Sequence, residues 1–170
     1  MANRNAPDLL IEDCTIRWRN FTGVEKKYNR PGDRNFHAVL DREDLLELVP
    51  QLEEDGWNLT FDNRNPEDQE EGWEPRHPSI ECAVRYDKGK PPKIVTITSA
   101  GPTELKEATV ESLDWADIAK IDLIIHPSWY DVNGREGLKA YVKTMFVTIN
   151  EDELEKKYAH LYDTDGVDDE

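Results

Sequence analysis

The sequence predicts a mainly β domain with a few short helices, and three observations lead to this fold class. Several segments alternate apolar and polar residues with the period of two that a half-buried strand requires. The dipeptide Asn133-Gly134 separates two long strand-like segments and is the strongest two-residue hairpin signal. The length of 170 residues favours one domain with a moderate core.

The first strand is predicted at residues 9–21. Its two faces carry Cys14, Ile16 and Trp18 on one side and Arg17, Arg19 and Phe21 on the other. A second strand is predicted at 34–40. Asp41 is then placed to cap a short helix, which Pro50 should kink or end. The apolar stripe of that helix is Leu45, Leu48, Val49 and Leu52.

The middle of the chain predicts three more strands and one further helical segment. A strand is expected at about 57–62, and residues 62–78 are predicted to form a long acidic loop insertion. Strands at about 79–87 and 93–99 flank a turn, and a helical segment is expected at about 103–115.

The hairpin of residues 121–132 and 135–149 is the most strongly indicated element. Its two-residue turn fixes the register, so Tyr130 faces Gly137 and His126 faces Tyr141. One face is then apolar and belongs to the core: Leu123, Ile125, Pro127, Trp129, Leu138, Ala140 and Val142. The other face is basic and aromatic: His126, Ser128, Tyr130, Gly137, Lys139, Tyr141 and Lys143.

The C-terminal segment divides into a helix and a tail. Residues 150–153 form a good helix start with acids in the first turn, so a helix is predicted at 151–161. Residues 162–170 have almost nothing to bury and are expected to be disordered. Residues 1–150 are therefore predicted to form the folded domain.

The distribution of charge along the sequence bears on function. The chain carries 37 acidic and 21 basic residues, a formal net charge of −16, which on its own argues against a polyanionic partner. The charge is uneven, however. Residues 41–81 hold 14 acidic and 3 basic side chains and residues 150–170 hold 9 and 2, whereas residues 15–40 hold 6 basic and 2 acidic side chains. The predicted strands are therefore neutral to basic.

Composition and motifs disfavour an enzyme. The four histidines form no metal-binding pair, and the glycines form neither a phosphate-binding loop nor a nucleophile elbow. No cofactor and no metal are expected. No apolar run approaches a membrane span, so we expect a cytoplasmic protein without a membrane partner. Cys14 and Cys82 fall on apolar faces and are expected to be buried thiols.

A positive surface with exposed aromatic rings is what single-stranded nucleic acid binding without sequence preference requires. The predicted strands and the loop between the first two supply both residue types. The candidate contacts are Arg17, Arg19, Phe21, Lys26, Lys27, Tyr28, Arg30, Arg34, Phe36, Tyr130, Lys139, Tyr141 and Lys143. The alternative is that these are ordinary solvated strand faces. Of the other aromatics, a core position is predicted for Trp18, Trp57, Trp115 and Trp129, while Trp73 is left unassigned.

Several motifs together resemble the single-stranded DNA-binding proteins of bacteriophages. They are Ile16-Arg17-Trp18-Arg19-Asn20-Phe21, Tyr28-Asn29-Arg30, Gly32-Asp33-Arg34-Asn35-Phe36, Gly56-Trp57-Asn58, Leu113-Asp114-Trp115, Ile121-Asp122-Leu123-Ile124-Ile125, Gly137-Leu138-Lys139-Ala140-Tyr141 and Met145-Phe146-Val147-Thr148-Ile149. The resemblance covers most of residues 8–160 apart from the acidic loop, which is longer and more acidic than the family pattern. It implies an OB-fold, a five-stranded partly open barrel, here with extra hairpin and loop elaborations.

The resemblance also implies a role in phage replication or recombination and an acidic tail that contacts other phage or host replication proteins. The tail residues are Asp163, Asp165, Asp168, Asp169 and Glu170. They could also occupy the basic face as an intramolecular DNA mimic. A homodimer is compatible with the sequence. The alternative function is an acidic DNA mimic that inhibits or recruits a basic protein.

Overall fold

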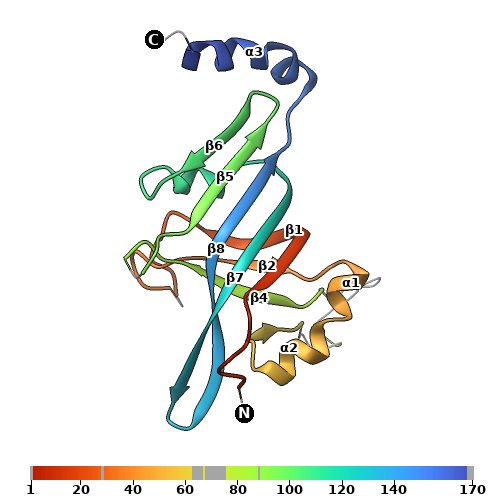
Figure 1. The fold of residues 1–170 in the computed structure, drawn as a ribbon, viewed down its shortest axis with the longest axis vertical. Coiled ribbons are helices and arrows are strands. Elements are labelled where there is room, and N and C mark those ends of the chain that lie inside the picture. Colours follow the sequence, from red (N-terminus) through yellow and green to blue (C-terminus); the bar gives the residue numbers. More distant parts are fainter. Residues whose placement is uncertain (1, 28, 63–66, 68–75, 88, 168–170) are drawn as a thin grey trace.

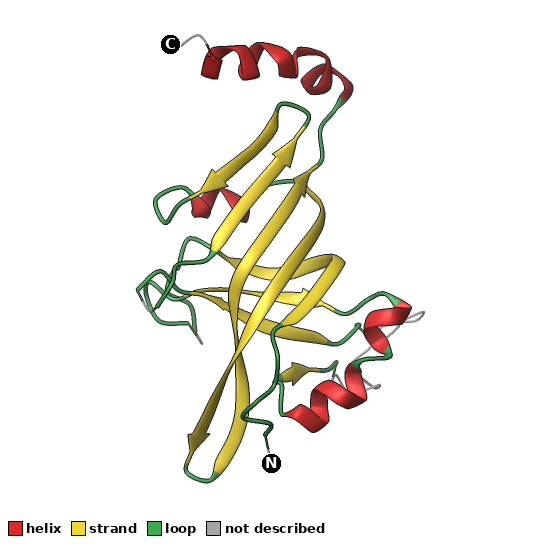
Figure 2. Ribbon diagram, in the orientation of Figure 1, coloured by secondary structure: helices red, strands yellow, loops and turns green. Residues whose placement is uncertain are grey.

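The computed structural model describes residues 2–27, 29–62, 67, 76–87 and 89–167; for residue 160 and residues 162–167 it describes the backbone alone. Strands dominate the architecture, as the sequence predicts (Figures 1 and 2). The strands are β1 (Leu9–Asn20), β2 (Arg34–Val39), β3 (Leu59–Thr60), β4 (Ser79–Val84), β5 (Lys93–Thr98), β6 (Gly101–Leu105), β7 (Ile118–Val132) and β8 (Arg135–Ile149). The helices are α1 (Glu43–Leu46), α2 (Val49–Asp55), the 3₁₀ helix η2 (Val110–Asp114) and α3 (Glu153–Val167).

Five of the strands close into a barrel. Around the ring, β1 pairs with β2, β2 with β4, β4 with β8, β8 with β7, and β7 with β1. All of these pairings are antiparallel except β4 with β8, where Cys82 lies opposite Ala140 and Ala83 opposite Tyr141. This order and the single parallel pair between the third and fifth ring strands give the OB-fold topology. The predicted five-stranded barrel is confirmed.

The β7–β8 hairpin has the predicted register at its tip. Tyr130 pairs with Gly137 and His126 with Tyr141, and a bulge between Ile124 and Ile125 shifts the register further along. The turn uses positive φ at Asn133 (53°) and Gly134 (84°), which explains why this dipeptide occupies it. The end of the hairpin extends beyond the barrel as a two-stranded ribbon (Figure 1). The chain around Gly56 braces the ribbon through the bond from Leu138 N to Gly56 O (2.8 Å).

The remaining elements lie outside the ring. Strand β5 runs parallel to β8 and extends the sheet, β6 pairs with β5, and β3 pairs with β4. The predicted helix is interrupted before Pro50, which lies in the first turn of α2 and does not end α1. The N-cap of α1 is Arg42, without a side-chain cap hydrogen bond, so the predicted capping by Asp41 is wrong. The helix predicted at 103–115 is wrong over its first residues, because Thr103 to Leu105 pair with β5 and this tertiary pairing overrides their local helical preference. Only Val110–Asp114 is helical.

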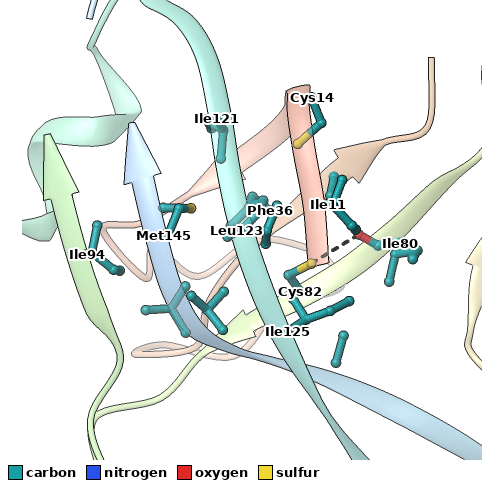
Figure 3. Close-up of a cluster of buried hydrophobic side chains, with 14 of the residues drawn as sticks. Ile11, Cys14, Phe36, Ile80, Cys82, Ile94, Ile121, Leu123, Ile125 and Met145 are labelled. Atoms are coloured by element: carbon teal, nitrogen blue, oxygen red, sulfur yellow. Dashed lines mark hydrogen bonds between the residues drawn. The ribbon is translucent and has the colours of Figure 1, made fainter. Parts of the chain in front are cut away.

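The barrel interior is filled by branched aliphatic side chains and two stacked rings. Phe21 and Phe36 are fully buried, with ring centroids 5.2 Å apart. Figure 3 shows Cys14 and Cys82 among these side chains, which confirms that both thiols are buried. Burial raises the pKa of Cys14 to about 12 and raises that of Cys82 as well. Neither thiol is therefore ionised near neutral pH.

Strand β1 departs from the predicted alternation. Two residues, Asp13 (φ 52°) and Trp18 (φ 54°), have left-handed backbone conformations, and the pairings of β1 shift register at both places. Each bulge exchanges the two faces of the strand. Phe21 consequently enters the core, while Trp18 is 47% exposed. The prediction that Trp18 is a core residue is wrong for this reason.

Helix α3 begins where Asp152 accepts a hydrogen bond from Glu155 N (2.7 Å). It runs to Val167, so it passes the predicted end at residue 161. Its apolar stripe of Leu154, Tyr158 and Leu161 is largely exposed. No helix among the described residues is both long and apolar enough to span a bilayer.

Candidate nucleic-acid interface

The outer surface of β2, β4 and β8 forms one continuous face, which we call the cleft face. Side chains that alternate with the buried core residues point outward here. Across the strands, Asn35 lies opposite Ala83, and Ala83 lies opposite Tyr141. Barrel closure therefore joins the basic and aromatic side of β8 to β2, which is more than 100 positions away in the sequence. In OB-folds, this face and the adjoining loops bind oligonucleotides.

Two adjoining clefts hollow the cleft face. The larger has a volume of about 590 Å³ and is lined by Arg85, Gly89, Lys90, His126, Ser128, Tyr141, Val142 and Lys143. The smaller has a volume of about 230 Å³ and is lined by Asn29, Asp33, Arg34, Asn35, Asn58, Glu81, Ala83, Arg85, Lys139 and Ala140. Arg85 borders both. Residues from five separate segments thus converge on one surface that carries cations and an aromatic ring.

The predicted basic and aromatic face of β8 is confirmed in its geometry. Lys139 and Lys143 are exposed, and Tyr141 lies half-buried between them. The Nζ of Lys139 lies 5.4 Å from the centre of the Tyr141 ring, within cation–π range. This strand therefore offers a stacking surface flanked by two positive charges.

Tyr130 lies on the same side of the ribbon. Its hydroxyl and the Asn58 amide exchange hydrogen bonds of 2.9 and 3.1 Å. Its ring covers Gly137, where a Cβ would lie 2.6 Å from the Tyr130 Cζ. The absence of a side chain at Gly137 is thus what allows this ring to lie flat across the ribbon.

Trp18 lies at the β1 border of the cleft face. The edge of its ring meets the His37 ring at a centroid distance of 4.7 Å. The guanidinium groups of Arg17 and Arg76 lie 4.5 and 5.2 Å from the ring centre. A bulky residue at positive φ is an uncommon and strained feature that is frequent at functional sites. The exposure of Trp18 was not predictable, because the bulge that turns it outward leaves no sequence pattern; its position between two arginines is the one signal that the sequence offers.

His37 lies beneath Trp18 in a polar cluster. Its Nδ1 is 2.9 Å from the Ser79 hydroxyl, which also accepts a hydrogen bond from Arg17 Nη2 (3.1 Å). Burial, and then the charge of Arg17, lowers the pKa of His37 to about 4. His37 is therefore neutral at physiological pH, and the positive charge here belongs to the arginines.

Three predicted contacts have structural roles instead. The predictions for Phe21 and Phe36 are wrong, because both rings are fully buried and stacked on each other, where no base can reach them. Arg19 Nη1 donates to the carbonyls of Leu113 (2.8 Å) and Ala116 (2.7 Å), so its guanidinium holds the η2 turn against β1.

The loop between β1 and β2 flanks the smaller cleft. Asn29 organises it by donating to the carbonyls of Val24, Arg30 and Asp33. Lys26, Lys27 and Arg30 are exposed on this loop. Arg34 is half-buried and pairs with Glu107 at 3.3 Å. Tyr28 lies outside the described residues.

Of the other three tryptophans predicted in the core, two lie there. Trp57 is buried and Trp129 packs half-buried against the core, as predicted, whereas Trp115 is 74% exposed, so its core prediction is wrong. Trp115 follows η2 directly and its ring projects from that turn.

Some of the predicted residues lie outside the described part: Trp73, Asp168, Asp169 and Glu170, together with the side chains of Asp163 and Asp165. Within the described part, no group of three or more His, Cys, Asp or Glu side chains could hold a metal ion.

Known proteins resemble the chain in sequence family and in fold. The family model described as "Putative phage ssDNA-binding domain" matches residues 2–169. The single-stranded DNA-binding protein from bacteriophage Enc34 in complex with ssDNA has a similar structure, with a TM-score of 0.55, 6% identity, and coverage of 85% of this chain and 88% of that one. A C-terminal truncation of the Enc34 protein gives a TM-score of 0.52 at 7% identity, covering 85% and 87%. At these identities the likeness shows a shared fold. No curated protein matches the sequence.

Proposed function

Because the chain belongs to the phage ssDNA-binding domain family, we propose that it binds single-stranded DNA on the cleft face, without catalysis and largely independently of sequence. The observation that carries this proposal is the convergence of Tyr141, Lys139 and Arg85 on two adjoining clefts. The structural neighbour in complex with ssDNA supports the choice of ligand. The action would take place in the host cytoplasm during replication or recombination.

Base stacking explains a preference for single strands. The Tyr141 and Trp18 rings can stack only on bases whose faces are free, and in a duplex those faces are covered by neighbouring base pairs. Each stacked base contributes about 1–3 kcal/mol, and this gain hardly depends on base identity. Lys139 and the arginines around Trp18 would neutralise the phosphates between stacked bases. The result is a strand held along the barrel with its bases turned toward the protein.

The net charge of −16 is compatible with this ligand. Much of the negative charge lies in residues 41–81 and 150–170, while the cleft face carries lysines and arginines. At physiological ionic strength the Debye length is about 8 Å, so charges beyond that distance act weakly on a bound strand. A strand bound in the clefts would therefore be affected mainly by the charges that line them, which are Arg34, Arg85, Lys90, Lys139 and Lys143 against Asp33 and Glu81.

A titration of fluorescently labelled oligo-dT and a matched duplex, at two salt concentrations, tests the proposal. We expect tighter binding of the single strand and a log–log salt slope of about −0.7 per phosphate neutralised. Tyr141→Ala and Lys139→Gln should each weaken binding. Lys120→Gln is the matched control, since Lys120 is an exposed lysine paired with Asp13 that lines neither cleft. Absence of oligonucleotide binding at low salt would refute the proposal and favour an acidic DNA mimic.

The acidic C-terminal residues form the second part of the proposal. Residues 150–170 carry 9 acidic and 2 basic side chains, and they could compete with DNA for the cleft face and recruit phage or host replication proteins. Deletion of residues 162–170 should then tighten oligo-dT binding, most clearly at low salt. Equal affinities of the full-length and shortened chains would exclude the competition.

A further inference from the structure

The Asp8 carboxylate contacts two residues that line the larger cleft, His126 and Lys143. Its Oδ1 lies 2.7 Å from His126 Nδ1, and its Oδ2 lies 2.9 Å from Lys143 Nζ. An ionised carboxylate only accepts hydrogen bonds, so His126 donates from Nδ1. The hydrogen bond from Lys143, and then that from His126, lowers the pKa of Asp8 below its ordinary value of 3.8. Asp8 is therefore charged at neutral pH.

Strand pairing holds this carboxylate in place. Asp8 directly precedes β1, whose Leu9 pairs with Ile125 of β7, so Asp8 lies beside His126. His126 in turn pairs with Tyr141 of β8. The carboxylate thus belongs to one row of residues across three strands, and that row ends at the aromatic ring of the larger cleft.

His126 and Lys143 already bind an anion in this arrangement. Two donors from neighbouring strands each hold one oxygen of the same carboxylate, and both donors line the larger cleft beside Tyr141. Two oxygens of one negatively charged group are also what a DNA phosphodiester presents. A base stacked on Tyr141 would bring its phosphate toward these donors.

We infer that His126 and Lys143 form a phosphate subsite of the larger cleft, and that Asp8 occupies it as a built-in competitor that a DNA phosphate must displace. This inference rests on the proposed function. The side chains of His126 and Lys143 are 63% and 59% exposed, so their contacts with Asp8 are solvated and readily exchanged. Asp8 would therefore weaken DNA binding and keep it reversible.

Asp8→Asn tests the inference, because the amide preserves size while removing the charge. We expect it to tighten oligo-dT binding by about threefold to tenfold, since one like charge within a few ångströms of a phosphate is removed. The salt slope should also become steeper. Glu12→Gln is the matched control: it removes one acidic charge from β1, four residues after Asp8, where the Glu12 carboxylate acts on Lys120. A purely positioning role of Asp8 would give the opposite result, weaker binding.

The variants distinguish competition by Asp8 from a structural role of this residue. Tighter binding by Asp8→Asn but not by Glu12→Gln supports the inference; unchanged or weaker binding by Asp8→Asn overturns it. The gain from Asp8→Asn should shrink when Lys143 is replaced by glutamine, and an undiminished gain would remove Lys143 from the subsite. Should Asp8→Asn fail to fold, unchanged binding by Lys143→Gln overturns the subsite instead. If the wild-type chain and all variants fail to bind oligo-dT, it is the proposed function that has failed.

Discussion

Trp18 offers the sharpest test of the path that bound single-stranded DNA would take across the protein. Glycine at this position removes the ring and also relieves the positive φ of 54°, which costs a bulky residue about 1–2 kcal/mol. The ring is 47% exposed, so the packing lost with it is moderate and offsets that gain. We therefore expect Trp18→Gly to change the free energy of unfolding by less than about 1 kcal/mol. Loss of one base stack should weaken DNA binding by about 1–3 kcal/mol, or roughly fivefold to 150-fold in Kd.

The assay is fluorescence anisotropy with labelled oligo-dT, combined with urea denaturation of each variant. Trp18→Phe retains an aromatic face and should recover most of the affinity. Trp115→Ala is the control, because Trp115 is the more exposed tryptophan and lies at the end of η2, outside the strands of the cleft face. A folded Trp18→Gly variant with wild-type Kd would show that the bound DNA does not reach the β1 border of the cleft face. Equal losses for Trp18→Gly and Trp115→Ala would show that the cleft face does not define the path.

Three further changes test the core, the polar cluster and the ribbon. Phe36→Ala should lower the free energy of unfolding by about 3–5 kcal/mol in urea denaturation, and a loss below about 1 kcal/mol would contradict the burial of this ring. Because the pKa of His37 falls from 6.5 to about 4 on folding, its contribution to stability should be complete above pH 6.5 and be lost as pH falls toward 4. The urea midpoint of His37→Gln should fall less over that window, and parallel curves would contradict this. Gly137→Ala should displace the Tyr130 ring and reduce oligo-dT affinity, whereas an unchanged Tyr130 environment by NMR would show that the ribbon absorbs the methyl group.

The β7–β8 hairpin was predictable because local chemistry determines it. Asn133 and Gly134 tolerate the positive φ that a two-residue turn needs, and such a turn sets the pairing of every residue near it. Once the register is known, period-two alternation places Lys139, Tyr141 and Lys143 on one side. The same reasoning applied to β1 failed, because the bulges at Asp13 and Trp18 come from pairing with two neighbouring strands.

The clefts could not be predicted for a related reason. Arg85 directly follows β4, Asn35 belongs to β2, and Asn58 lies in the segment after α2, and only closure of the barrel brings them together. The parallel pairing of β4 with β8 closes the barrel, and no local pattern in either strand indicates this pairing. Trp115 shows a different error. As an apolar residue in an apolar pattern it was predicted to lie in the core, but it follows η2 at a turn that directs it into solvent.

Three cations of the cleft face are already paired with carboxylates of the same chain. Lys143 pairs with Asp8, Arg85 with Asp87, and Arg34 with Glu107, at 2.9 to 3.3 Å. A phosphate that binds one of these cations replaces a carboxylate, and the released carboxylate attracts salt cations from solution. The net release of counterions is then smaller than the number of contacting cations implies. We therefore expect the salt slope of the wild-type chain to fall short of about 0.7 per cation on this face, with base stacking supplying the larger share of the affinity. Asp8→Asn and Glu107→Gln should each make the slope steeper, and a wild-type slope equal to the full count of cations would show that these pairs do not persist in solution.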